Sequence, residues 1–348
     1  MARIMKTDIK SLSETELKSL LEALGEKPFR SAQVFDWIHK KKAQSFDEMT
    51  NLSLALRERL KEEAELVSLV PVSVQASRLD GTRKYLFRLE DGNLIESVFM
   101  PYHHGNSVCV SSQAGCRMGC RFCASTIHGL SRNLKASEIL EQVYAIERDT
   151  KERVSHVVMM GSGEPFDNYE AAVRFIRLIS SEKGADLSIR NITVSTCGLT
   201  EGIRRFAEED LPVTLALSLH APNQALRESL MPVARRYDLQ EVIEACSFYF
   251  ETTHRRLTFE YALMNGINDS EACARELSEL LKGQHAHINL IPVNPVEERD
   301  FRQPDSARIS SFVKILEKNG INVTIRRTMG ADIDGACGQL RNRVLQNS

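Results

Sequence analysis

Three cysteines in the run Cys116-Arg-Met-Gly-Cys120-Arg-Phe-Cys123 have the type and spacing to bind a metal centre. The spacing, C-x3-C-x2-C, places three thiolates on one loop and supplies no fourth. A 4Fe–4S cluster normally takes four cysteine ligands, so three would leave one iron open to a small chelating molecule. The alternative is a zinc site with a distant fourth ligand, such as His128. The spacing favours the cluster over zinc.

Polar residues follow several apolar runs of the chain. One run ends at Met160 and continues as Gly161-Ser162-Gly163-Glu164-Pro165, where the glycines would let the backbone approach a ligand and Glu164 could accept a hydrogen bond from an ammonium group. Three further runs end in Ser195, in Ser218-Leu219-His220 and in Asn294. Because ligands bind at the C-terminal ends of strands in βα folds, we expect these residues to share one site for a polar small molecule.

The cysteines outside the loop differ in what they suggest. Cys109 lies inside a strand-like run before the loop, and Cys337 lies in a glycine-flanked segment that could carry a thiol into a site. Cys246 and Cys273 sit among apolar residues of helical segments, where a cysteine is usually a small buried hydrophobe. For Cys197 the sequence leaves both a chemical role and a structural role open and favours the structural one.

The elements that must position these residues alternate between strands and helices. Strands are expected at 107–111, 154–161, 189–196, 213–220, 257–264, 288–294 and 323–327. Helices are expected between them at 136–149, 169–179, 200–208, 239–252, 270–281 and 306–319. Such alternation predicts an α/β fold with a parallel sheet. Six βα units favour a partial (β/α)6 barrel over a closed eightfold barrel or a doubly wound sheet, but periodicity does not decide between barrel and sheet.

The first third of the chain follows another pattern. Residues 1–70 predict a small helical domain with helices near 14–24, 31–42 and 53–64, the second of which ends in the basic run His39-Lys-Lys-Lys42. Residues 71–105 predict a β-hairpin extension with strands at 84–90 and 93–100, joined by Asp91-Gly92. Residues 106–348 would then form the barrel and a C-terminal cysteine loop.

Composition limits the classes of protein that fit. The net charge of −2 means that any nucleic-acid-binding surface must be a local basic patch. No apolar stretch approaches the length of a membrane span, and the N-terminus has no apolar core of a signal peptide, so we expect a cytoplasmic protein without a membrane partner. Eight cysteines in such a chain indicate metal or thiol chemistry rather than a disulfide framework.

Taken together, the motifs resemble the RlmN/Cfr family of radical S-adenosylmethionine (SAM) RNA methyltransferases over essentially the whole chain. The resemblance is carried by 80–85 (Asp-Gly-Thr-Arg-Lys-Tyr), 96–101 (Glu-Ser-Val-Phe-Met-Pro), 109–116, the cysteine loop, 163–165 (Gly-Glu-Pro), 217–220 (Leu-Ser-Leu-His), 230–232 (Leu-Met-Pro), 293–295 (Val-Asn-Pro) and 336–340 (Ala-Cys-Gly-Gln-Leu).

The resemblance implies a radical SAM barrel and a role for each candidate residue. It implies that Cys116, Cys120 and Cys123 hold a 4Fe–4S cluster. It implies that SAM is bound by Gly163, Glu164, Ser195, Ser218, Leu219, His220 and Asn294. It further implies that Cys337 carries the methyl group, that Cys109 resolves the product through a disulfide, and that Glu96 accepts a proton. The helical domain would bind RNA.

The implied reaction uses two SAM molecules per turnover. One methylates Cys337, and the second yields a 5′-deoxyadenosyl radical that activates that methyl for addition to an unstacked adenine. The targets would be carbon 2 of adenosine 2503 in 23S rRNA and adenosine 37 in tRNA, with flavodoxin or ferredoxin as electron donor. The alternative within the family is methylation of carbon 8 of the same rRNA base. Outside it, the alternatives are another radical SAM chemistry, which would not need Cys337, and a zinc-bound RNA-binding protein.

Overall fold

The computed structural model describes residues 6–293, 299–327, 329–333 and 339–346. Two candidate residues, Asn294 and Cys337, lie outside the described residues. No helix among the described residues is long and apolar enough to cross a membrane.

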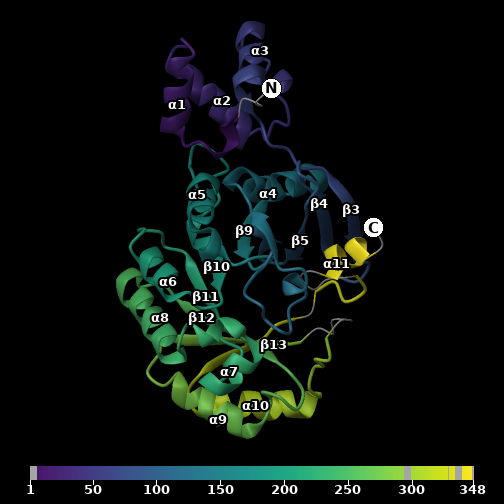
Figure 1. Cartoon of the computed structure of the whole chain (residues 1–348), viewed down its shortest axis with the longest axis vertical. Coiled ribbons are helices and arrows are strands. Elements are labelled where there is room, and N and C mark those ends of the chain that lie inside the picture. Colours follow the sequence, from purple (N-terminus) through teal and green to yellow (C-terminus); the bar gives the residue numbers. More distant parts are fainter. Residues whose placement is uncertain (1–5, 294–298, 328, 334–338, 347–348) are drawn as a thin grey trace.

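A sheet of ten strands organises the chain (Figure 1). Seven of its strands are parallel and follow one another in sequence order: β6 (Gly105–Cys109), β9 (Val154–Met159), β10 (Ile192–Thr196), β11 (Thr214–Ser218), β12 (Leu257–Leu263), β13 (Ala286–Pro292) and β14 (Asn322–Ile325). The two ends of this parallel run do not pair with each other, so the barrel is open. This arrangement confirms the predicted partial (β/α)6 barrel.

Each step along the parallel run includes a predicted helix. These are α4 (Ala136–Thr150), α5 (Tyr169–Ile179), α6 (Thr200–Ala207), α8 (Leu239–Thr253), α9 (Glu271–Leu280) and α10 (Ser306–Lys318). A further short helix, α7 (Gln224–Leu230), precedes α8 and was not predicted. The apolar residues whose spacing predicted the six long helices form the stripe that packs on the sheet.

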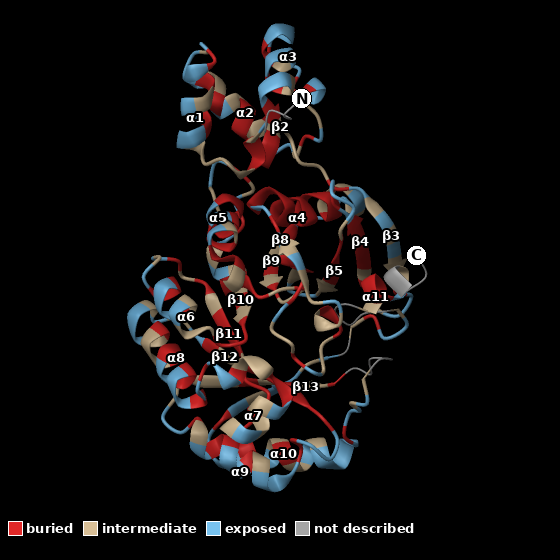
Figure 2. Cartoon of the chain, viewed as in Figure 1, coloured by how far each residue is buried: buried red, intermediate tan, exposed pale blue. Residues whose placement is uncertain are grey.

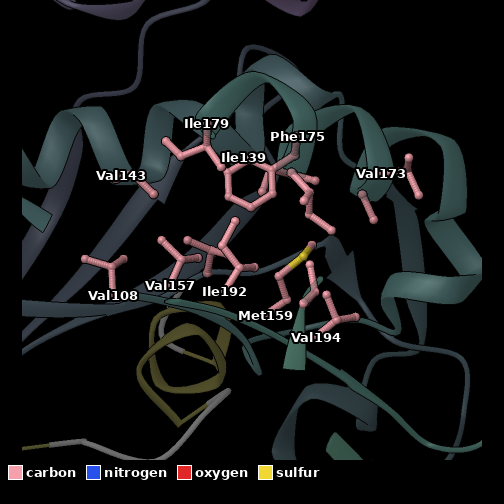
Figure 3. Packing of buried hydrophobic residues seen from close by; sticks show 14 of the residues in the cluster. Val108, Ile139, Val143, Val157, Met159, Val173, Phe175, Ile179, Ile192 and Val194 are labelled. Carbon is pink, nitrogen blue, oxygen red and sulfur yellow. The ribbon is translucent and has the colours of Figure 1, made fainter. Parts of the chain in front are cut away.

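The main core lies between the sheet and these helices (Figure 3). Val157 of β9 and Ile192 of β10 point towards Ile139 of α4 and Phe175 of α5, and all four side chains are fully buried. The side chains that alternate with this set along the strands face the inside of the barrel. The β-branched residues that predict the strands therefore also fill the core.

The N-terminal module consists of α1 (Glu14–Ala23), α2 (Phe29–His39) and α3 (Leu54–Glu63). The predicted start of α1 is confirmed, because Ser13 and Glu16 form a reciprocal capping box. The sequence predicted only helices for this module and missed two short strands. Thr7–Asp8 (β1) and Ala64–Glu65 (β2) pair as a two-stranded parallel sheet that joins the two ends of the module.

The module rests on α4, which is buried over most of its surface (Figure 2). Lys10 forms an ion pair with Glu141, and both side chains are fully buried. His39 shares a 3.0 Å hydrogen bond with the hydroxyl of Tyr144. Glu141, a charged residue of α4, is therefore covered by the module rather than by solvent.

The hairpin extension has three strands, β3 (Pro71–Ala76), β4 (Arg83–Arg88) and β5 (Leu94–Tyr102), and β3 was not predicted. β5 continues the sheet by antiparallel pairing with β6. The last described helix, α11 (Gln339–Gln346), lies beside these strands in Figure 1, with Leu340 packed against Leu86 and Leu94. The C-terminal segment therefore returns to the extension.

Candidate active site

The cysteine loop is held at its base by a short antiparallel pair, β7 (Gln113–Gly115) and β8 (Leu130–Asn133). Gly115 has φ of +82°, and a Cβ there would lie 2.0 Å from the carbonyl oxygen of Gly129. Glycine is therefore needed for the strands to meet. The backbone N–H of Cys116 donates to that same carbonyl at 3.0 Å. This frame, which sequence reasoning did not predict, fixes where the three thiols begin.

The loop is also attached to its surroundings at its middle. The N–H of Arg121 donates to the carbonyl oxygen of Leu230 at the end of α7, at 2.9 Å. Cys120 belongs to a small apolar cluster with Leu230 and Met231 that is separate from the main core. The loop is thus held from α7 as well as from its own base.

A cavity of about 260 Å³ opens between the loop and the C-terminal ends of the strands. It is lined by all three loop cysteines and by five of the predicted SAM-binding residues: Gly163, Glu164, Ser195, Ser218 and His220. The structure thus brings together, within one cavity, groups that are far apart in the sequence. This is the site expected at the C-terminal face of a βα barrel.

Glu164 is a buried carboxylate whose two oxygens both accept backbone hydrogen bonds. Oε1 accepts from Phe166 at 3.0 Å, and Oε2 accepts from Cys197 at 2.8 Å. Burial raises the pKa of Glu164, while these bonds oppose the rise. Glu164 therefore joins the glycine turn after β9 to the end of β10, as well as lining the cavity.

The glycine turn also contacts the base of the cysteine loop. The N–H of Glu164 donates to the side-chain oxygen of Gln113 at 2.9 Å. A Cβ on Gly163 would lie 2.6 Å from Ser112 Oγ and 2.7 Å from the backbone nitrogen of Gln113. Only glycine allows this close approach.

The strand ends of β10 and β11 present a hydroxyl pair and an imidazole. The hydroxyls of Ser195 and Ser218 lie 3.4 Å apart. Burial, helped by Arg227, lowers the pKa of His220 to about 3, so the ring is neutral. Its Nδ1 accepts the N–H of Ala262 at 2.9 Å, which leaves the proton on Nε2 as a donor.

Leu219 differs from Ser218 and His220 in the direction of its side chain. Its side chain is fully buried in the main core and does not line the cavity. Its N–H already donates to the carbonyl oxygen of Glu260 at 3.0 Å. Any contribution of this residue to a ligand would therefore come through its backbone carbonyl.

Cys109 lies behind the cavity wall, and Glu96 contacts the start of α11. Cys109 forms an apolar cluster with Val98 and Met100, and Met160, which lines the cavity, packs against that cluster. The Glu96 carboxylate is 3.0 Å from Lys84 Nζ and accepts the N–H of Arg341 at 2.6 Å. Glu96 therefore holds the start of α11, just beyond the segment that carries Cys337.

The cavity also contains residues that sequence reasoning missed. Glu260, Arg326 and Cys197 line it, and Asn289 donates to Glu260 at 2.8 Å. The sequence did carry a signal for Glu260, a carboxylate between Phe259 and Tyr261 in a mostly apolar strand. Cys197, left open by the sequence, is a buried thiol in the wall of the site. Cys246 is fully buried as predicted, whereas Cys273 is only partly buried.

The donor set suits a cluster better than a zinc ion with His128. His128 is exposed and does not line the cavity. Among the described residues, no three His, Cys, Asp or Glu side chains converge closely enough to hold a single metal ion. Burial raises the pKa of Cys116 to about 12 and raises that of Cys120 too, with added repulsion from Cys123 and Glu164. Ionised thiols would thus need a multiply charged cation among them.

Comparisons with known proteins agree with this geometry. Residues 7–66 match the family described as the ribosomal RNA large subunit methyltransferase N-terminal domain, and residues 110–277 match the radical SAM superfamily. The chain is 58% identical over 341 residues to a probable dual-specificity RNA methyltransferase RlmN of Lachnospira eligens, which covers 98% of this chain and 97% of the relative. The protein of the same description from Lachnoclostridium phytofermentans is 58% identical over 336 residues, or 97% and 94% of the two chains.

A solved structure is similar over nearly the same extent. The crystal structure of a radical SAM methyltransferase from Sphaerobacter thermophilus superimposes with a TM-score of 0.92 at 45% identity. The match covers 96% of this chain and 98% of that one.

Proposed function

This chain belongs to the RlmN family of radical SAM RNA methyltransferases, and on that premise we propose that it methylates carbon 2 of adenosine 2503 in 23S rRNA and adenosine 37 in tRNA. The observation that carries the proposal is the single cavity that collects the three loop cysteines and the polar ends of β9, β10 and β11, in a chain so similar to the dual-specificity enzymes.

The cofactors of the enzyme are a 4Fe–4S cluster and SAM. We assign the cluster to Cys116, Cys120 and Cys123, because they share one loop and line one cavity. When bound, one SAM would supply the methyl group, and the reduced cluster would supply the electron that cleaves a second SAM to a 5′-deoxyadenosyl radical.

The SAM site is assigned to the strand ends. The backbone of Gly163 offers close approach, the hydroxyls of Ser195 and Ser218 offer polar contacts, and His220 offers an Nε2–H donor. Leu219 would contribute backbone only, while Asn294 follows β13 outside the described residues. Glu164 orders the turn and lines the cavity.

Two thiols and one carboxylate handle the methyl group. Cys337, outside the described residues, is proposed to accept the methyl through its thiolate, since sulfur is a strong nucleophile. Once the base is joined to Cys337 through that carbon, Glu96 accepts a proton. The Cys109 thiolate would then attack the Cys337 sulfur, the bond between that sulfur and the carbon would break as the disulfide forms, and the released carbon would take up a proton to complete the methyl group of the RNA. The proposal is supported by the bond from the N–H of Arg341 to Glu96, because Arg341 follows Cys337 closely in the sequence.

The remaining parts of the chain are assigned to the RNA and the electron donor. Residues 1–70 form the RNA-binding domain, 71–105 the extension and 106–348 the catalytic barrel. The module carries Lys41 3.8 Å from the ring of Trp37 and Arg30 4.9 Å from the exposed Phe29, a combination that suits nucleic acid. A flavodoxin or ferredoxin would supply the electrons.

The test is an anaerobic reaction of the reconstituted protein with SAM, a reductant and either 23S rRNA or tRNA, followed by digestion to nucleosides and mass spectrometry. The expected product co-elutes with 2-methyladenosine from both RNAs, and the Cys337→Ala variant yields none. A dominant 8-methyladenosine product would contradict the choice of carbon, and methylation of rRNA alone would contradict dual specificity.

A further inference from the structure

Arg227 in α7 is a fully buried arginine behind the wall formed by the ends of β10 and β11. Its Nη2 donates to the carbonyl oxygen of Cys197 at 2.6 Å and, at the limit of hydrogen bonding, to that of Ser218 at 3.5 Å. Within the described part of the chain, Nε and Nη1 have no hydrogen-bond partner. Two of the three guanidinium nitrogens are therefore buried and unpaired.

Such an arrangement is costly unless an anion offsets it. A guanidinium remains protonated at neutral pH even when burial lowers the pKa of Arg227. Moving an ion into a protein interior carries a large desolvation cost, and unpaired donors add to that cost. The thiols of Cys197, Cys120 and Cys246 and the neutral ring of His220 lie near the guanidinium. Among the described residues, no carboxylate forms an ion pair with Arg227.

The surroundings of Arg227 place it next to the cysteine loop. α7 is bonded to the loop through Arg121 and Leu230, and Cys120 packs in the same apolar cluster as Leu230. Space is kept for the guanidinium by Gly198, where a Cβ would lie 3.2 Å from Nη2 and 2.9 Å from Val242. The charge is thus built into the wall behind Cys120 and Cys197.

We propose that Arg227 is a positioning residue for the cluster, whose buried positive charge offsets the negative charge of the three thiolates and makes the cluster easier to reduce. This inference rests on the assignment of the cluster to Cys116, Cys120 and Cys123. A cluster with three thiolate ligands is a net anion, and an added electron makes it more negative. A fixed cation close to it therefore stabilises the reduced state more than the oxidised state.

A purely structural role makes a different prediction. If Arg227 served only to bond the carbonyl oxygens of Cys197 and Ser218, its loss would lower stability with or without the cluster and would leave the reduction potential unchanged. The potential of the cluster, measured without RNA or SAM, therefore separates the two roles.

The experiment compares the wild type with Arg227→Lys, Arg227→Met and the control Arg235→Met, which changes an exposed arginine in the turn after α7. Each protein is reconstituted anaerobically and titrated with dithionite and redox mediators, and the signal of the reduced cluster is followed by electron paramagnetic resonance. We expect a more negative potential in Arg227→Met, and potentials close to wild type in Arg227→Lys and Arg235→Met. Equal potentials in Arg227→Met and wild type, at equal iron content, would overturn the proposal.

If Arg227→Met does not take up iron, the thermal unfolding of its cluster-free form is compared with that of the cluster-free wild type. This comparison separates a role towards the cluster from a structural role. An Arg227→Met chain that melts no lower than the cluster-free wild type would support the proposal, because the substitution would then have impaired binding of the anionic cluster and not the fold. A variant that melts lower would show a structural role and overturn it. A wild-type chain that binds no iron would contradict the cluster assignment itself, and the inference with it.

Discussion

At the scale of single residues, Cys120 is a buried loop cysteine that packs with Leu230 of α7. Replacing it by Ala should abolish iron binding and SAM cleavage, because two thiolates cannot hold the cluster. The fold should survive with a loss of about 1 kcal/mol, since Cys120 lies outside the main core. Iron analysis and circular dichroism measure the two effects, and Cys273→Ala on α9 is the control. Normal iron content in Cys120→Ala would contradict the assignment.

Cys109 should behave differently from the loop cysteines. It is buried behind the cavity wall in an apolar cluster, so Cys109→Ala should leave the cluster and the first methyl transfer intact. Without a resolving thiol, RNA should remain covalently attached to Cys337 and appear as a slow band on a denaturing gel. Cys109→Ala combined with Cys337→Ala should lose the band. Normal turnover by Cys109→Ala would disprove its resolving role.

At the scale of elements, the contact between α2 and α4 makes stability depend on pH. Burial, with a contribution from Lys10, lowers the pKa of His39 to about 3 in the folded protein, below its ordinary value of 6.5. Between these values the unfolded chain binds a proton that the folded chain does not, so stability falls as pH drops below about 6.5. The loss is about 1.4 kcal/mol per pH unit, or about 2 kcal/mol at pH 5.

Denaturant unfolding at pH 7 and pH 5 measures this loss. His39→Gln should reduce the difference between the two pH values by about 2 kcal/mol, whereas His103→Gln, at an exposed position, should leave it unchanged. His220, whose pKa is lowered in the same direction, should keep a similar dependence in both variants. An unchanged difference in His39→Gln would mean that His39 is solvated or protonated in the folded protein.

At the scale of the whole molecule, the C-terminal segment is tied to the turn between β3 and β4. Asp80 accepts the N–H of Gly330 at 2.8 Å, and Asp332 accepts from Ser77 at 2.6 Å and from the N–H of Arg78 at 2.8 Å. Although burial acts to raise it, the N–H groups of Gly330 and Thr82 lower the pKa of Asp80 to about 2. These bonds fix the chain just before the Cys337 segment.

Asp80→Ala should therefore loosen the approach to Cys337 without touching the cluster. Charge-assisted hydrogen bonds contribute about 1.5–3 kcal/mol each, so we expect methylation of Cys337 to fall about tenfold or more. Mass spectrometry of the peptide containing Cys337 measures this, with the absorption spectrum of the cluster as the internal reference. Asp47→Ala, at an exposed position of the N-terminal module, is the control. Wild-type methylation in Asp80→Ala would show that this anchor is dispensable.

The sequence by itself determined what depends on local order along the chain. The C-x3-C-x2-C spacing indicated the cluster, apolar periodicity indicated the strands and helices of the barrel, and strand ends indicated Ser195, Ser218 and His220 as neighbours. These follow from spacing because helices and strands have fixed periods, and because parallel strands end at the same edge.

Only the tertiary structure decided contacts between distant segments. The sequence could not show that the carboxylate of Glu164 bonds to the backbone of Cys197, that β7 and β8 close the cysteine loop, or that Glu96 holds α11. It also gave no sign that Arg227, in a short helix, lies buried behind Cys197 with two unpaired nitrogens. Such contacts depend on which chain segments pack together, and a buried charge looks the same as a solvated one until its surroundings are folded around it.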